Sequence, residues 1–199
     1  MAAQLDFFYF IGSTYTYLSV MRIEAVAAAS GIELRWRPFS VRTIMNEQNN
    51  VPFRDKPVKT RYMWRDIERR ARRCGLPFPR VPGYPVDPDE LANRVAVVAC
   101  EQGWCPQYTR ATYRAWFEHD LLPGVGDNVQ RVLTGLGKDA EAIVALADSA
   151  EIRGRYDAET DVARRLGIFG SPTFACGSEL FWGDDRLEDA IEWSQEHSA

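Results

Sequence analysis

Two polar segments at opposite ends of the chain carry residues that could do chemistry together. Ser13 follows an apolar run, residues 5–11, and one glycine. Near the C-terminus, Ser171 and Pro172 stand between an expected helix and an expected short strand. Because proline lowers the cost of a cis peptide to roughly 0.5–1 kcal/mol, the Ser171–Pro172 bond is a candidate cis peptide. A serine at position 13 cannot form a disulfide, but its hydroxyl can donate a hydrogen bond to the thiolate of another molecule.

A thioredoxin-type redox enzyme would carry Cys-x-x-Cys where this chain has Ser13, and would pair the backbone before its cis proline with a peptide thiol. The four cysteines lie elsewhere and lack that spacing: Cys74, Cys100, Cys105 and Cys176. The pattern therefore favours a protein that uses glutathione over a disulfide exchanger. With only two histidines available, a metal site is not expected, and the cysteines are interpreted as buried or incidental thiols.

The composition describes an ordinary globular chain. The 199 residues are 46% hydrophobic and 26% charged, with a net charge of −4 that gives no attraction to nucleic acid. The one basic cluster, formed by Arg69, Arg70, Arg72 and Arg73, is expected to be the solvated face of a helix. We find no signal peptide and no stretch of roughly 20 apolar residues, so a cytoplasmic protein with no membrane contact is expected.

The first 38 residues predict a strand–helix–strand unit. Residues 5–11 are almost continuously apolar, as in a strand buried on both faces. Apolar residues at three- and four-residue steps predict a helix over 15–29, which Ser13 or Thr14 could cap. Residues 32–37 alternate as a second strand. Such a unit is a right-handed parallel crossover.

The rest of the chain predicts a helical block and then a return to strands. Residues 40–57 are polar and are expected to form a loop, and residues 76–88 hold five prolines and must be extended. The expected helices are 58–74, 88–102, 106–120, 125–136, 139–151, 152–166 and one beginning at 183–186; the expected hairpin pairs 173–176 with 179–182. This order predicts an α/β thioredoxin-like fold, residues 1–40 and 152–199, interrupted by an all-helical insertion domain, residues 41–151.

Three blocks of sequence resemble the 2-hydroxychromene-2-carboxylate isomerases, relatives of the kappa-class glutathione transferases within a larger disulfide-oxidoreductase-like family. The blocks are residues 6–18, residues 59–66, and residues 169–174 followed by 181–187. They occur in the family's order, while the helical middle matches only in kind. The chain departs from the pattern in having Thr14 where a proline is usual and Phe10 where an acidic residue is frequent.

The resemblance implies glutathione as cofactor, a homodimer, and a small aromatic substrate. Ser13 would contact the glutathione sulfur, and Ser171 with Pro172 would pair with the cysteinyl unit as a short added strand. The remaining glutathione contacts would come from Asn50, Lys59, Asp184 and Asp185, with Lys59 on the glycyl carboxylate and Asp185 on the ammonium. The residues proposed to face the substrate are Tyr15, Tyr62 and Trp64, with Arg61 and Asn50 as further donors to a developing oxyanion and with Trp36 and Phe39 as further apolar lining.

The favoured function is a glutathione-dependent isomerase of an unsaturated aromatic acid, acting on an intermediate of aromatic-compound degradation by reversible thiol addition and elimination. A kappa-like transferase or peroxidase would keep the cofactor and change the reaction. A non-catalytic binding protein with the same fold is the third alternative, and it predicts that replacing Ser13 leaves function untouched.

Overall fold

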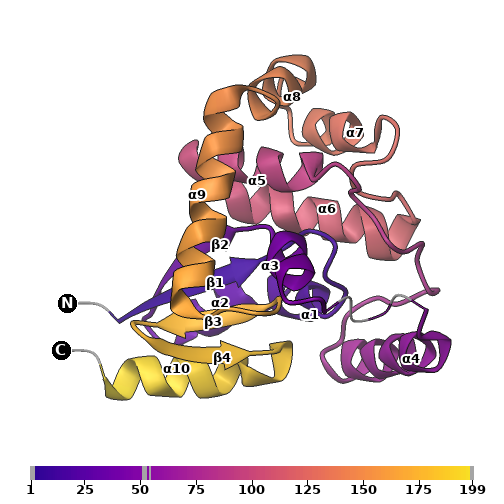
Figure 1. Cartoon of the computed structure of the whole chain (residues 1–199). Coiled ribbons are helices and arrows are strands. Elements are labelled where there is room, and N and C mark those ends of the chain that lie inside the picture. Colours follow the sequence, from indigo (N-terminus) through magenta and orange to yellow (C-terminus); the bar gives the residue numbers. More distant parts are fainter. Residues whose placement is uncertain (1–2, 51–52, 54, 198–199) are drawn as a thin grey trace.

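The computed structural model describes residues 3–50, 53 and 55–197, and its centre is a four-stranded sheet (Figure 1). The strands are β1 (Gln4–Tyr9), β2 (Glu33–Pro38), β3 (Thr173–Cys176) and β4 (Glu179–Trp182), in the order β2-β1-β3-β4. β1 pairs in parallel with β2 and antiparallel with β3, and β3 and β4 form the predicted hairpin. The two ends of the chain therefore meet in one sheet, which confirms the thioredoxin-like fold.

Both faces of β1 are buried, as its apolar run predicts. Phe7 and Tyr9 belong to the larger core, which also receives α2 (Ile23–Ala29) and α10 (Leu187–Glu196). Phe8 and Phe10 point into a smaller core formed with α3 (Val41–Glu47) and α9 (Ala150–Leu166). Helices on both faces fix the end of β1, and the loop that carries Ser13 starts there.

The helix predicted over 15–29 is wrong in one respect, because it is two helices. α1 (Thr16–Val20) ends at Met21, and α2 begins after Arg22, whose φ of −130° breaks the helical path. The Arg22 side chain reaches the backbone carbonyl of Asp184 at 2.7 Å and the carboxylate of Glu188, both far away in sequence. This long-range anchoring holds Arg22 at the break between the two helices.

Neither Ser13 nor Thr14 caps α1, contrary to the prediction. The N-cap residue is Tyr15, and no side chain caps it. The Thr14 hydroxyl instead lies 3.1 Å from the sulfur of Met63, on α4 (Pro57–Arg73). The hydroxyl of Ser13 is thus free of a capping role.

The polar segment 40–57 is also not the simple loop that was predicted. It contains α3, whose N-cap Ser40 accepts a hydrogen bond from the Thr43 amide at 3.1 Å. Val41 and Ile44 are buried against the smaller core, so two apolar residues one turn apart and a serine cap are enough for a short helix. The predicted proline-rich loop is confirmed, because described residues 76–88 contain no helix or strand.

Four helices pack together above the sheet in Figure 1: α5 (Leu91–Glu101), α6 (Cys105–His119), α7 (Asn128–Gly135) and α8 (Ala140–Ala147). The helix predicted over 139–151 stops at Ala147, because Ser149 caps the next helix through the Ile152 amide. α9 then runs from α5 and α8 down to the sheet, while α4 lies at the lower right, where it contacts α1. The boundaries of the two predicted domains stay a prediction.

Within the described ranges, no helix is long and apolar enough to cross a membrane. The same residues include no group of three or more His, Cys, Asp or Glu side chains that could hold a metal ion.

Candidate functional site

The two ends of the chain meet in a hydrogen bond between Ser13 and Ser171. The Ser13 hydroxyl donates to the Ser171 backbone carbonyl at 2.6 Å, and the Ser171–Pro172 peptide bond is cis. The hydroxyl is therefore directed at the backbone group that the sequence predicts to pair with a peptide ligand. Fold topology brings together two residues that are 158 positions apart.

The side chain of Ser171 is itself held by hydrogen bonds to the loop after β1 and to α1. Its Oγ accepts a hydrogen bond from the Phe10 amide at 2.9 Å and lies 3.0 Å from the hydroxyl of Thr16. The chain can turn from Phe10 to Ser13 because Gly12 has a φ of +136°, and a Cβ there would lie 2.5 Å from the Phe10 ring. The positions of both serines are thus set by the turn at Gly12 and by the hydrogen bonds that the Ser171 hydroxyl makes.

Two helices of the helical block hold the Ser13 loop from the other side. On α6, the buried Tyr113 hydroxyl donates to the carbonyls of Phe10 and Ser13 at 2.9 and 3.0 Å. On α5, the Asn93 amide group accepts from the Ile11 amide at 2.7 Å and donates to the Ile11 carbonyl at 2.9 Å. Burial raises the pKa of Tyr113, so its hydroxyl stays a donor at any working pH. Backbone groups of the Ser13 loop therefore have hydrogen-bond partners both on the helical block and at Ser171.

We expect Tyr113→Phe to misplace Ser13 as well as to weaken the fold. The substitution removes the hydroxyl donor to the Ser13 carbonyl and leaves the Phe10 carbonyl with the Ser13 amide, which costs about 1–3 kcal/mol of unfolding free energy. Tyr108→Phe is the matched control, because Tyr108 is a buried tyrosine of the same helix that donates to the Ala92 carbonyl at 3.1 Å. Denaturant unfolding should show similar losses for both variants, whereas only Tyr113→Phe should reduce binding of a thiol ligand. Equal ligand binding by both would contradict this role.

A buried ion pair joins α4 to the turn before α10. Asp184, the first residue of the 3-10 turn η1 (Asp184–Arg186), is 1% exposed, and its Oδ2 accepts from Arg70 at 2.8 Å. Arg22 lies 3.9 Å from the same oxygen. Within the described residues, the other carboxylate oxygen is buried without a hydrogen-bond partner. The side chain of Asp184 is therefore occupied by arginine, and the glutathione contact predicted at this position, through its backbone amide, stays a prediction.

Burial raises the pKa of Asp184 to about 6, against the opposing charges of Arg70 and Arg22. Because the folded protein binds this proton more tightly than the unfolded chain, the Asp184 contribution to stability is greatest below pH 4 and is lost as the pH rises through 6. We expect a relative gain of about 2–3 kcal/mol between pH 7 and pH 4. Thermal unfolding of wild type and Asp184→Asn across this range checks it: the gain should vanish in the variant, and parallel curves would contradict it.

Asp185 and Tyr15 both lie near Arg70 of this ion pair. Partial burial alone would raise the pKa of Asp185, but hydrogen bonds from Arg186 and from its own amide, with the charge of Arg70, bring it below the usual value. Its side chain is 47% exposed, so an ionised carboxylate faces solvent here. The Tyr15 hydroxyl donates to Asp66 of α4 at 3.1 Å.

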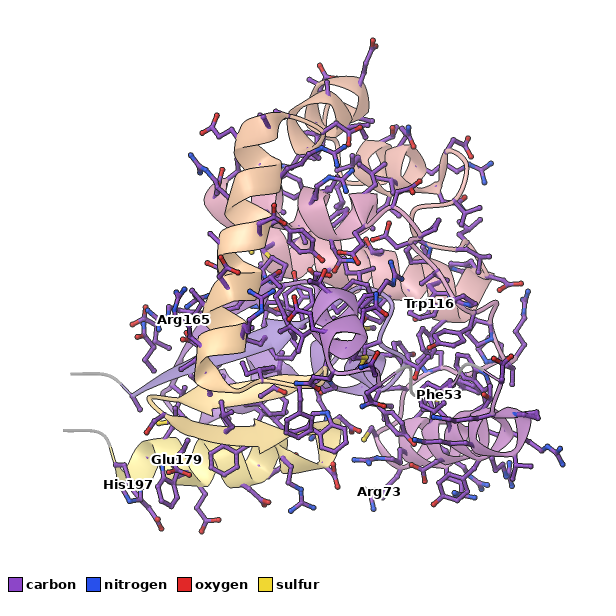
Figure 2. All side chains as sticks on the ribbon, viewed as in Figure 1. Phe53, Arg73, Trp116, Arg165, Glu179 and His197 are labelled. Carbon is purple, nitrogen blue, oxygen red and sulfur yellow. The ribbon has the colours of Figure 1, made fainter. Side chains whose placement is uncertain are left out.

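The remaining predicted residues lie toward the start of α4. Asn50 and Lys59 are exposed, and the Lys59 ammonium lies 5.4 Å from the ring of Phe53, which Figure 2 labels beside α4. Tyr62 is 63% exposed. An open apolar depression of about 510 Å³ is lined by Lys56, Pro57, Val58, Lys59 and Tyr62. In the described part of the chain, no hydrogen bond or ion pair links Asn50 or Lys59 to Ser13.

Trp64, a predicted substrate contact, is buried in the core, as is Phe39 of the predicted apolar lining. It is 8% exposed, and its ring neighbours are Phe78, Tyr84 and Phe117, at centroid distances of 6.0–6.4 Å. Its contact with substrate stays a prediction.

Sequence reasoning missed Arg70, and it assigned the arginine cluster of α4 wholly to solvent. Arg69, Arg72 and Arg73 are exposed, as expected, but the Arg70 side chain is 17% exposed and pairs with Asp184. A signal existed, because Arg70 lies three residues after buried Ile67 and so on the inner face of α4. Asn93, Tyr113 and Thr16 carried no comparable signal, since only the fold brings them to the loop.

Comparison with known proteins places this geometry in a family. The model of the DsbA-like thioredoxin domain matches residues 4–192. A 2-hydroxychromene-2-carboxylate isomerase of Pseudomonas putida is 25% identical over 92% of this chain and 90% of its own length. Glutathione S-transferase kappa 2 of Caenorhabditis elegans is 24% identical over 96% of this chain and 92% of its own.

A solved structure of a 2-hydroxychromene-2-carboxylate isomerase superposes with a TM-score of 0.83 and 26% identity, covering 96% of this chain and 95% of the other. The resemblance predicted from the three sequence blocks is confirmed. The chain therefore belongs to the family of DsbA-like thioredoxin domains.

Proposed function

We propose that this protein is a glutathione-dependent isomerase of an unsaturated aromatic acid of the 2-hydroxychromene-2-carboxylate type. One observation carries the proposal: a serine hydroxyl, not a cysteine, meets the backbone of the cis-proline loop, at 2.6 Å. Support comes from relatives that are named as such isomerases and match along more than nine tenths of this chain.

The residues present fit glutathione, which has a thiol, a peptide backbone, two carboxylates and an ammonium group. Ser13 offers a donor for the sulfur, and Ser171 offers a carbonyl for a peptide N–H. Asp185 offers an exposed carboxylate for the ammonium, and Lys59 offers an exposed ammonium for the glycyl carboxylate. The backbone amides of Asp184 and Asp185 and the side chain of Asn50 are proposed to complete the set.

The hydrogen bond between Ser13 and Ser171 is the part of the site that changes when a ligand binds. Its two groups satisfy each other in the structure, so a peptide thiol can use both: the Ser171 carbonyl accepts a peptide N–H, and the Ser13 hydroxyl turns to the sulfur. A free thiol with a pKa near 8.5 is only a few per cent thiolate at neutral pH, and each tenfold gain requires about 1.4 kcal/mol. Since α1 has only five residues, Ser13 supplies more of this energy than the helix dipole.

When bound, glutathione would supply a thiolate that adds reversibly to a conjugated double bond of the substrate, permits rotation, and leaves unchanged. The oxyanion that develops on the substrate needs a donor. Burial, together with the charge of Asp66, raises the pKa of Tyr15, so its hydroxyl stays protonated, and we propose that it turns from Asp66 to donate to the oxyanion. Tyr62, Arg61 and Asn50 are the other donors proposed, on the exposed side of the site.

A kappa-like glutathione transferase or peroxidase is the second candidate, favoured by the match to the kappa transferase of C. elegans. NMR of protein, glutathione and 2-hydroxychromene-2-carboxylate separates the two. The isomerase converts the substrate while the reduced glutathione signal stays constant. Formation of a conjugate, or loss of glutathione to its disulfide with a hydroperoxide, would replace the isomerase proposal by the second candidate.

We expect Lys59→Met to weaken glutathione binding and leave the chemical step intact. Loss of one exposed ion pair with the glycyl carboxylate should raise the Kd for glutathione by up to about fivefold. Lys138→Met is a matched control, because the Lys138 ammonium similarly lies 4.7 Å from an aromatic ring, that of Trp104, on the helical block. The expected pattern is a higher KM for glutathione with unchanged kcat for Lys59→Met alone. An unchanged KM would remove Lys59 from the site.

The homodimer expected from the resemblance is also a proposal, and sedimentation equilibrium measures it directly.

A further inference from the structure

Two cysteines that the proposed function does not use lie side by side where α5 passes into α6. Cys100 is in the last turn of α5, and Cys105 is the first residue of α6. A tight turn through Gly103, with φ of +77°, brings them together and is closed by the Trp104 amide bonding to the Ala99 carbonyl at 2.9 Å. The two sulfur atoms are 2.6 Å apart. This separation exceeds the length of a disulfide bond, which is close to 2.04 Å, by about 0.6 Å.

The two thiols differ in access. Cys105 is 3% exposed, and its sulfur lies 3.2 Å from the buried hydroxyl of Tyr9 in β1. Cys100 is half-buried and borders a cavity of about 240 Å³. The cavity is lined by Trp36, Pro38, Val97, Cys100, Glu101, Arg155, Ala158 and Glu159. Cys100 is therefore the more accessible of the two thiols, whereas Cys105 is buried against Tyr9.

We propose that Cys100 and Cys105 are a redox site that closes to a disulfide with hydrogen peroxide or a small alkyl hydroperoxide. The sulfur of Cys100 attacks one peroxide oxygen, the O–O bond breaks, and water or an alcohol leaves, which makes a sulfenic acid. The Cys105 sulfur then attacks the Cys100 sulfur and displaces the hydroxyl as a second water. Two thiols are oxidised by two electrons, the peroxide is reduced by two, and a reducing thiol reverses the bond.

The surroundings of the Cys100 thiol predict that it reacts slowly with peroxide. The hydrogen bond to Cys105, then burial and nearby negative charge, raise the pKa of the Cys100 thiol, so little thiolate is present at neutral pH. Glu101 and Glu159 face the cavity and oppose the thiolate further, and Arg155 is the one cation among its lining residues. Oxidation should therefore become faster as the pH rises from 7 to 9.

The test uses the wild-type protein and needs no variant to fold. The folded chain is treated with hydrogen peroxide, denatured, alkylated and cut with trypsin. Both cysteines fall in one tryptic peptide, residues 95–110, because no Lys or Arg lies between Arg94 and Arg110. We expect neither cysteine of this peptide to be alkylated, and the peptide to be lighter than its reduced, unalkylated form by two hydrogen atoms. Dithiothreitol added before alkylation should restore the two free thiols. A peptide that stays fully alkylated while exposed Cys74 is oxidised would overturn the proposal.

Variants keep the assignment specific. Cys74→Ser and Cys176→Ser should leave the intrapeptide disulfide unchanged, which excludes exchange with the other two cysteines. Cys105→Ser should yield Cys100 as a sulfenic or higher acid and no disulfide. Oxidation of the 95–110 peptide in wild type only to sulfinic or sulfonic acids would also overturn the proposal, because it would show that Cys105 does not resolve the first product.

Discussion

Replacing Ser13 by alanine is expected to lower the isomerisation rate by about 10- to 150-fold. The substitution removes the one side-chain hydroxyl that donates to the Ser171 carbonyl at 2.6 Å and that we propose to donate to the glutathione sulfur. A hydrogen bond to a charged group contributes about 1.5–3 kcal/mol, which corresponds to this range of rates. The pH profile should change with it, because the thiol of the bound glutathione would titrate closer to its free pKa of about 8.5.

Ser178→Ala is the matched control for Ser13→Ala, because Ser178 is exposed in the turn of the β3–β4 hairpin. Steady-state rates at saturating glutathione, measured from pH 6 to 9, should be unchanged in the control. Thermal unfolding should show a small loss for Ser13→Ala, since the Ser171 carbonyl can bond to water or to the ligand. A normal rate in Ser13→Ala would contradict this role and favour a mechanism that does not pass through this serine.

Arg70→Met is expected to lower the free energy of unfolding by several kcal/mol, because Arg70 pairs with buried Asp184. It removes the guanidinium that holds Asp184 at 2.8 Å. Among the described residues, the 1% exposed carboxylate then keeps Arg22, at 3.9 Å, as its ion-pair partner. Breaking a buried ion pair from one side costs about 3–5 kcal/mol. For a chain of this size the Tm should fall by about 6–20 °C. Scanning calorimetry at pH 7 measures it.

Two further samples separate a lost ion pair from a lost side chain. Arg73→Met changes an exposed arginine one turn further along α4 and should shift the Tm by little. The double variant Arg70→Met with Asp184→Asn should recover part of the loss, because no unpaired charge is then buried. Lowering the pH to 5 should also narrow the gap between Arg70→Met and wild type, since Asp184 takes up a proton near pH 6. A gap that is independent of pH and persists in the double variant would contradict this explanation.

The parts of the fold that follow from local pattern were predicted well. The β3–β4 hairpin has the predicted bounds, because a Gly-Ser turn between two short apolar runs fixes its register locally. The burial of both faces of β1 follows from its continuous apolar sequence. The elements that were wrong depend on distant contacts. α1 and α2 separate at Arg22, whose partners are Asp184 and Glu188, and no periodicity near Arg22 announces them.

The candidate site also divides into residues that a local sequence pattern identifies and residues that only distant contacts bring in. Ser13 and Ser171 were found because each follows a sequence landmark, the end of a buried strand and a Ser-Pro step, and the structure joins them. Tyr113 and Asn93 support the same loop, but they act from α5 and α6 through backbone groups that any residue presents. Asp184 was identified by position, yet its side chain faces Arg70, a pairing 114 residues apart that only the tertiary structure creates.

Calorimetric titration of the purified protein with reduced glutathione tests the central claim most directly. We predict saturable binding with one site per chain in the millimolar range or tighter, weaker binding by Ser13→Ala and Asp185→Asn, and unchanged binding by Ser178→Ala. Absence of binding heat at glutathione concentrations of several millimolar would contradict the claim that this protein uses glutathione. The chain would then be a DsbA-like thioredoxin domain with a binding role that does not involve glutathione.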